Sequence, residues 1–164
     1  MWIYFVISGV ILLDQAVKYF VQNRMYVNES ISVIGEVFRI TFIMNKGAAF
    51  GMLSDLDSRI RIPFFLILGF CFLGFVIFYF KKILKEGFLT RLSFSLIAGG
   101  AAGNLIDRIT FHGQVRDFIE LGINTQYKFA VFNIADAAIS TGVCLLIINY
   151  MAAGRKEKNV SRTV

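Results

Sequence analysis

The chain has 164 residues, of which 57% are hydrophobic, 15% aromatic and 17% charged. This apolar share is too high for a soluble domain of this size and predicts one integral membrane domain over residues 1–164. The formal net charge of +6 does not indicate nucleic-acid binding, because the basic residues gather beside the apolar segments and near the C-terminus, as membrane topology would require.

Residues 2–22 are predicted to form the first transmembrane helix, because roughly 20 apolar residues cross the hydrocarbon core of a bilayer. Asp14 and Lys18 lie inside this segment, four residues apart, so they share one helix face and can form an ion pair. Charged residues within a membrane segment call for a partner or a function. We interpret the pair as a polar support that holds the helix against an active-site wall. A simple ion pair at the helix end is the alternative.

Residues 23–62 are mixed and polar, and they are expected outside the membrane. Two stretches rich in β-branched and aromatic residues, 31–34 and 37–44, flank Gly35 and Glu36 and predict a small hairpin. Open sheet edges are not tolerated in the bilayer, so the hairpin must lie on its surface. The following residues, 45–53, mix small and large apolar side chains and predict a short interfacial helix, with a connecting loop as the alternative.

Two further spans are predicted at residues 63–80 and 89–109. Pro63, the only proline, is expected in the first turn of the second span, where its missing N–H group costs little. The loop between these spans carries three lysines within residues 81–85. The positive-inside rule therefore places this loop in the cytoplasm.

The fourth span is predicted at residues 131–152, and it is followed by a second basic segment. Its basic residues are Arg155, Lys156, Lys158 and Arg162. By the same rule both termini are cytoplasmic. With four spans, residues 23–62 and 110–130 then lie on the outer face of the membrane.

The outer end of the third span combines small and polar residues. Gly99, Gly100 and Gly103 lie close together and would let another helix approach closely. Three polar residues follow at helical spacing, Asn104, Asp107 and Arg108. They form a cluster that is costly beside lipid unless it faces a cavity.

Asp117, in the second outer segment, and Asp136, at the start of the fourth span, are the candidate catalytic residues. They are 136 − 117 = 19 residues apart, which is enough chain to bring them together. Two adjacent carboxylates repel each other and can share one proton, so that one activates water while the other donates a proton during amide hydrolysis. Asn133 could orient a carboxylate or polarise the carbonyl group. For each aspartate alone, helix capping or a surface charge is the alternative.

Other chemistries have weaker support in the sequence. His112, the only histidine, has no nucleophile at a recognisable spacing and is interpreted as a loop residue. Cys71 and Cys144 lie inside predicted spans and indicate neither a disulfide nor a zinc site. A channel or transporter and a metal-dependent hydrolase remain as rival functions. The first would place its acids through the depth of the bilayer, and the second would need carboxylate ligands for a cation such as magnesium.

Five ordered motifs resemble the bacterial lipoprotein signal peptidases, also called signal peptidase II, over nearly the whole chain. These motifs are Asp14 with Lys18, residues 45–51 (NKGAAFG), residues 99–108 (GGAAGNLIDR), residues 115–119 (VRDFI) and residues 132–136 (FNIAD). The resemblance implies an all-α membrane protein with four transmembrane helices, a small extracytoplasmic β-cradle and a short interfacial helix.

The resemblance also implies an activity. Members of this family are aspartic endopeptidases of the bacterial cytoplasmic membrane that cut diacylglyceryl-modified prolipoproteins just before the lipidated cysteine. Asp117 and Asp136 match the catalytic dyad. The positions that match the substrate site are Asn45, Asn104, Arg108 and Asn133, and those that match the polar support are Asp14, Lys18 and Asp107.

The resemblance further implies a monomer in contact with membrane lipid, with its active site at the outer leaflet. It implies no metal or other cofactor, no nucleic-acid partner, and inhibition by the cyclic peptide globomycin. The chain departs from the common pattern at Phe129 and Ala130, where many members have Trp-Pro, and at Ala137, where serine is common. These departures leave the two aspartates in place and bear on the shape of the loop before the fourth span.

Overall fold

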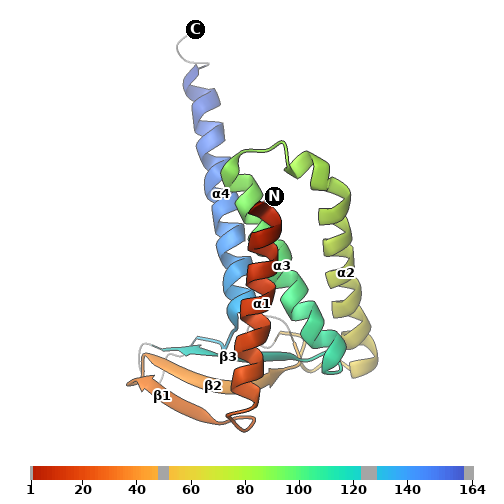
Figure 1. Ribbon diagram of the computed structural model, residues 1–164, viewed down its shortest axis with the longest axis vertical. Coiled ribbons are helices and arrows are strands. Elements are labelled where there is room, and N and C mark those ends of the chain that lie inside the picture. Colours follow the sequence, from red (N-terminus) through yellow and green to blue (C-terminus); the bar gives the residue numbers. More distant parts are fainter. Residues whose placement is uncertain (1, 48–51, 123–128, 161–164) are drawn as a thin grey trace.

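A computed structural model describes residues 2–47, 52–122 and 129–160 of the chain. The described residues form four helices that stand side by side above a small sheet (Figure 1). The helices are α1 (Trp2–Gln22), α2 (Ser58–Ile83), α3 (Phe88–Thr110) and α4 (Ile134–Val160). The strands are β1 (Ser30–Ile34), β2 (Phe38–Asn45) and β3 (Val115–Leu121).

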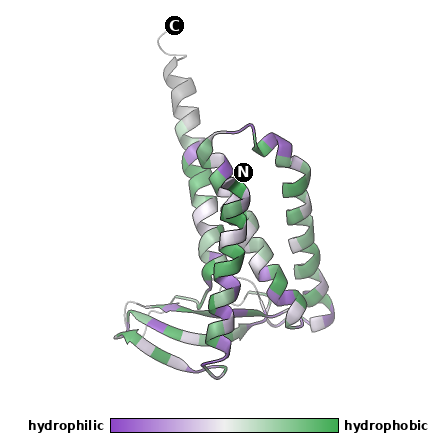
Figure 2. Cartoon of the chain, viewed as in Figure 1, coloured by the Kyte–Doolittle hydropathy of each residue, from purple (hydrophilic) through white to green (hydrophobic). Residues whose placement is uncertain are grey.

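Three of the helices are long and apolar enough to cross a membrane: α1, α2 and the Ile134–Ala152 part of α4. Apolar residues dominate the middle of these upright helices, whereas hydrophilic residues are more frequent toward the two ends of the bundle (Figure 2). The third predicted span, which corresponds to α3, is not among the three. Its glycines and its polar end lower its hydropathy, and α3 packs against the other three helices, so it needs less apolar surface toward lipid.

The helix bounds differ from the predicted spans most clearly at α2 and α4. Pro63 does not lie in the first turn as predicted, because α2 begins five residues earlier, at Ser58, and is capped by Asp57, whose side chain accepts a hydrogen bond from the Arg59 backbone N–H (2.8 Å). Pro63 is therefore inside the helix, where it removes one intrahelical hydrogen bond. Helix α4 begins at Ile134, three residues after the predicted start of the span.

The sheet is antiparallel, with the strand order β1-β2-β3. The predicted hairpin corresponds to β1 and β2, which pair from Ser30 with Thr41 to Ile34 with Phe38. The sequence did not indicate clearly that β3 would be a third strand. It pairs along the other edge of β2, with a bulge between Ile40 and Ile43. This bulge changes which side chains face each side of the sheet, and it leaves Asn45 beside the start of β3.

The predicted interfacial helix falls largely outside the described residues, because 48–51 are not among them. On either side of this gap Gly47, Met52 and Leu53 form bends or turns rather than helix. The chain then continues through Asp57 into α2.

Close packing around α3 sets the positions of α1 and α4. A Cβ atom added at Gly100 would lie 2.4 Å from the Ala135 carbonyl oxygen, and one added at Gly99 would lie 2.9 Å from Val10 Cβ. These distances are shorter than van der Waals contact, so the glycines let the backbones of α4 and α1 approach. The small residues of α3 thus act in helix packing, as predicted.

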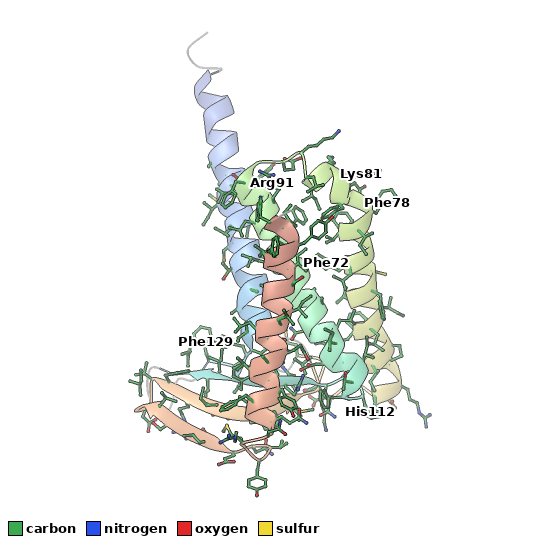
Figure 3. The ribbon with its side chains drawn as sticks, viewed as in Figure 1. Phe72, Phe78, Lys81, Arg91, His112 and Phe129 are labelled. Carbon is green, nitrogen blue, oxygen red and sulfur yellow. The ribbon has the colours of Figure 1, made fainter. Side chains whose placement is uncertain are left out.

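The two ends of the helical bundle differ in composition. The N-terminus, the C-terminal part of α4 and the α2–α3 connection lie at the end away from the sheet (Figure 1). Lys81 and Arg91 lie at this end, whereas His112 lies at the sheet end (Figure 3). The two candidate acids and the polar side chains that contact them come from the sheet end of the bundle.

Candidate active site

A cavity of about 540 Å³ opens where β3 meets the ends of α3 and α4 that lie nearest the sheet. Both candidate acids line it, together with polar side chains from β2 and α3 and apolar side chains from the segment before α4. Its lining residues include Asn45, Asn104, Arg108, Asp117, Asp136 and Phe132. One cavity therefore brings together residues from four separate segments of the sequence.

Asp117 is held on β3 and is almost fully buried, with 1% of its surface exposed. Both of its carboxylate oxygens accept hydrogen bonds from amide groups: Asn45 Nδ2 donates to Oδ2 (2.9 Å) and Asn133 Nδ2 donates to Oδ1 (2.6 Å). Burial raises the pKa of Asp117 to about 7, and the charge of Asp136 raises it further, whereas the two amide hydrogen bonds and the charge of Lys18 act in the opposite direction. Asp117 can therefore hold a proton near neutral pH.

Asp136 is fixed at the N-terminus of α4 by reciprocal hydrogen bonds with Asn133. The Asp136 backbone N–H donates to Asn133 Oδ1 (2.9 Å), and the Asn133 backbone N–H donates to Asp136 Oδ2 (3.2 Å). This is a capping box, in which the N-cap residue and the third helical residue satisfy each other's free N–H groups. The partial positive charge at the helix N-terminus favours the carboxylate form of Asp136.

The segment before α4 brings the two acids together. Phe132 pairs with Ile119 at the free edge of β3, where its carbonyl oxygen accepts hydrogen bonds from the N–H groups of Phe118 (3.0 Å) and Ile119 (2.8 Å). Asn133 follows directly and so lies beside Asp117. This backbone pairing positions one strand residue and one helix residue that are 19 positions apart in the sequence.

Asn104 links the acids to α1. Its Nδ2 donates to Asp136 Oδ1 (2.7 Å), while its Oδ1 accepts from Lys18 Nζ (3.0 Å) and Asn133 Nδ2 (3.1 Å). Because Lys18 can only donate, it fixes which end of the Asn104 amide points toward Asp136.

A fully buried cluster of charges lies beneath this network. Lys18 Nζ contacts Asp14 Oδ2 (2.8 Å) and Asp107 Oδ2 (3.3 Å), and Asp107 also receives Arg116 Nη2 at 2.7 Å. Two acids and two bases give this cluster a formal charge of zero. Asp14 also accepts from the backbone N–H of Ala135 (3.0 Å), which ties the cluster to the first turn of α4.

Sequence reasoning missed the roles of Arg116 and Gln15. Arg116 donates to both oxygens of Asp107 and to Gln15 Oε1 (2.9 Å), and Gln15 Nε2 donates in turn to Asp107 Oδ1 (3.0 Å). The available signal was alternation along β3: neighbouring residues of a strand point to opposite faces, so Arg116 faces α1 while Asp117 faces the cavity. The partners of Arg116 lie far away in the sequence and could not be identified from it.

The predicted substrate-binding residues divide into two groups. Asn45, Asn104 and Arg108 line the cavity, and the guanidinium of Arg108 lies over the Phe65 ring (4.7 Å) and donates to the Gly47 carbonyl oxygen (3.2 Å). Asn133 is fully buried and is absent from the lining. Asn133 therefore orients both acids from behind the cavity wall, through its hydrogen bonds to Asp117 and Asp136.

This arrangement is suited to acid–base chemistry at a carbonyl group. Each of the four carboxylate oxygens of the pair has one amide donor, so both acids are held in fixed orientations. One acid lies at a helix N-terminus, and the other has a pKa of about 7. Asp117 also feels the charge of Asp136, so the pair can share one proton near neutral pH, which makes one acid and one base available in the same reaction.

Comparison with known proteins agrees with these features. Two solved structures described as bacterial membrane enzymes, both determined by the in meso method, have the same fold. One has a TM-score of 0.80 and 33% sequence identity, covering 92% of this chain and 87% of that chain. The other has a TM-score of 0.77 and 34% identity, covering 90% of this chain and 91% of that one. The family model described as signal peptidase (SPase) II matches residues 6–152. The chain therefore belongs to the signal peptidase II family, the membrane proteases that cleave signal peptides from lipoproteins.

Proposed function

We propose that the protein is an aspartic endopeptidase that removes the signal peptide from diacylglyceryl-modified prolipoproteins, cutting just before the lipidated cysteine. The observation that carries this proposal is the bridge formed by Asn133, which donates to Asp117 Oδ1 through its side chain and to Asp136 Oδ2 through its backbone. A single buried residue thus orients both acids beside one cavity. Family membership supports the substrate class.

In the proposed mechanism, Asp136 is the base and Asp117 is the acid. Asp136 takes a proton from a water molecule as the water oxygen attacks the scissile carbonyl carbon. Asp117 donates its proton to the carbonyl oxygen, which gives a tetrahedral gem-diol. As the C–N bond breaks, Asp136 gives the proton that it took from water to the departing amine nitrogen, and a gem-diol hydroxyl returns a proton to Asp117 as the carbonyl group re-forms. The raised pKa of Asp117 supports this assignment. Asn45 and Arg108, at the cavity wall, would hold the substrate carbonyl groups.

We further propose that the protein crosses the membrane four times, with α3 as the third span along the chain, and that both termini are cytoplasmic. The basic α2–α3 connection at the end away from the sheet supports this orientation. The sheet and the active site would then lie at the outer leaflet. A diacylglyceryl group gains about 0.8 kcal/mol per buried methylene, so the lipid would hold the scissile bond at the depth of the acids.

The test is cleavage of a synthetic diacylglyceryl-modified precursor by purified protein. We expect Asp117→Asn and Asp136→Asn each to lower kcat by at least about 10³-fold while the protein remains folded, because general acid–base catalysis needs both groups. Glu86→Gln, which alters an exposed acid at the other end of the bundle, is the matched control and should keep full activity. Full turnover by either aspartate variant would contradict the dyad.

Two additions to this assay separate the alternatives. A chelator should leave activity unchanged, whereas a metal-dependent hydrolase would lose it. An unlipidated precursor should be cut poorly, and equal rates for both precursors would contradict the role of the lipid.

The proposed monomer and its inhibition by globomycin can be tested in the same way. All residues of the proposed site come from one chain, so a mixture of the Asp117→Asn and Asp136→Asn proteins should remain inactive. Recovery of activity in the mixture would indicate a site shared between chains. Globomycin should inhibit competitively if it occupies the cavity.

A further inference from the structure

The cavity continues past the two acids along one face of α4. Asp136, Ala137, Ser140 and Thr141 all line it. Because an α-helix has 3.6 residues per turn, these positions form one stripe. The two hydroxyl groups therefore lie one turn beyond Asp136, in the direction that leads away from the sheet.

Packing on the opposite face of α4 holds this stripe toward the cavity. Ala135 and Ala138 are buried, and a Cβ atom added at Gly142 would lie 2.7 Å from the Ser93 carbonyl oxygen. Helix α4 cannot rotate about its axis without forcing side chains into α3. The orientation of Ser140 and Thr141 is thus fixed by the backbone contact between the two helices.

Ser140 and Thr141 differ from three hydroxyl residues of the neighbouring helix α3. On α3, Ser93, Ser95 and Thr110 each donate to the carbonyl oxygen four residues earlier, at 2.7–2.8 Å. Ser140 and Thr141 make no such bond, and both side chains are exposed. Within the described part of the chain, neither hydroxyl has a protein partner. Each can still donate one hydrogen bond and accept others.

We propose that Ser140 and Thr141 form hydrogen bonds with the main chain of the substrate, at the residues just before the scissile bond. This inference rests on the proposed function. A peptide must be extended where it is cut, so its N–H and C=O groups there lose their helical partners. Unpaired backbone groups are costly in an apolar environment. The surrounding cavity wall is largely apolar and includes Val115, Leu121 and Ile139.

The direction of the chain agrees with this assignment. The signal peptide precedes the scissile bond and lies in the membrane, and α4 runs from Asp136 away from the sheet (Figure 1). Four residues of helix rise about 6 Å, which corresponds to roughly two residues of extended peptide. With the scissile carbonyl at Asp136, Ser140 and Thr141 therefore lie beside the second and third residues before the cut. Ser140 and Thr141 therefore position the substrate and do not take part in the chemical step.

The test measures kcat/KM for the diacylglyceryl-modified precursor with Ser140→Ala, Thr141→Val and the double variant. A typical net hydrogen bond corresponds to a change of about fivefold, so we expect about 5-fold losses for the single variants and about 10- to 30-fold for the double variant. Thr141→Ser keeps the hydroxyl and should retain activity. Thr110→Val is the matched control, because Thr110 is exposed and lies outside the cavity lining.

A second set of substrates separates hydrogen bonding from a structural effect. In each, one backbone amide among the three residues before the cut is replaced by an ester, which removes the N–H and weakens the carbonyl acceptor. At the substrate position that the hydroxyl groups contact, the ester should lower kcat/KM of the wild-type protein. For the double variant, the same ester should cause little further loss of kcat/KM, because the hydrogen bond is already absent. Equal fractional losses at every position, or wild-type kcat/KM for the double variant, would overturn the proposal. Absence of cleavage by the wild type would instead contradict the proposed function.

Discussion

At the scale of single residues, the raised pKa of Asp117 has a consequence for stability. Its ordinary pKa is 3.8, and burial raises it to about 7 in the folded protein. The carboxyl therefore binds its proton more tightly when folded than when unfolded, and ionisation opposes folding. The resulting destabilisation is absent below about pH 4, grows between pH 4 and 7, and is complete above pH 7.

Asp117→Asn should therefore increase the free energy of unfolding more at pH 8 than at pH 5. From the two pKa values the difference between these conditions is about 2–3 kcal/mol. Thermal or denaturant unfolding in one detergent at both pH values would measure it. The same shift at pH 5 and pH 8 would show that Asp117 titrates normally. The Glu86→Gln protein provides the baseline.

The same group predicts how activity depends on pH. If Asp117 must carry a proton and Asp136 must be ionised, kcat/KM should fall as pH rises through about 7, by about tenfold per unit, and should also fall in acid, where Asp136 takes up a proton and can no longer act as the base. The sign follows from the role of the acid, because deprotonation leaves two carboxylates and no proton donor. A profile that instead rises through pH 7 would assign the other role to Asp117.

Lys18 balances the negative charges of the buried acids Asp14 and Asp107. It contacts two fully buried acids and orients Asn104. Lys18→Met would leave Asp14 and Asp107 with only one base between them, and the loss of one partner from a buried ion pair costs about 3–5 kcal/mol. We expect a loss of this size in unfolding experiments, together with lower kcat. Lys81→Met, at an exposed position, is the control and should leave the free energy of unfolding and kcat unchanged within error. A Lys18→Met protein as stable as the wild type would contradict the electrostatic role of Lys18.

At the scale of elements, the separation of α3 and α4 sets the geometry of the acids. Gly100→Ala would place a Cβ atom 2.4 Å from the Ala135 carbonyl oxygen, next to Asp136. The helices must move apart, which should cost about 1–3 kcal/mol and lower kcat by weakening the hydrogen bond from Asn104 to Asp136. Gly74→Ala is the matched control, because a Cβ atom there meets nothing within 4 Å and alanine favours helix. Unchanged kcat for Gly100→Ala would show that this contact does not position the acid.

The elements also show where sequence reasoning succeeds and where it fails. Apolar length predicted the helices, and the hairpin followed from β-branched residues at 31–44. The charged residues Arg116, Asp117 and Glu120 interrupt the apolar pattern by which a strand is recognised, so β3 could not be predicted from its own sequence. It forms because its backbone pairs with the free edge of β2. The early start of α2 was hidden by Arg61, which is 9% exposed because its Nη1 donates to the carbonyl oxygens of Ser54 and Leu56.

The candidate site was predicted in its residue types but not in its connections. Paired acids and the amides near them could be identified because such groups are unusual beside apolar segments. The bridge formed by Asn133 and the contacts of Arg116 depend on backbone pairing between segments far apart in the sequence. Local patterns do not contain that information.

At the scale of the whole molecule, orientation in the membrane decides which side supplies the substrate. The sheet lies at one end of the bundle and the basic α2–α3 connection at the other (Figures 1 and 3). We therefore expect a membrane-impermeant maleimide added to intact cells to label Ser32→Cys, an exposed position of β1, but not Glu86→Cys. Cys71 and Cys144 are exposed on the described helices and would first be replaced by alanine to remove their signal. Permeabilised cells should label both positions, which controls for reactivity. Labelling of Glu86→Cys alone in intact cells would reverse the orientation, and it would put the acids on the side opposite to the lipidated precursors.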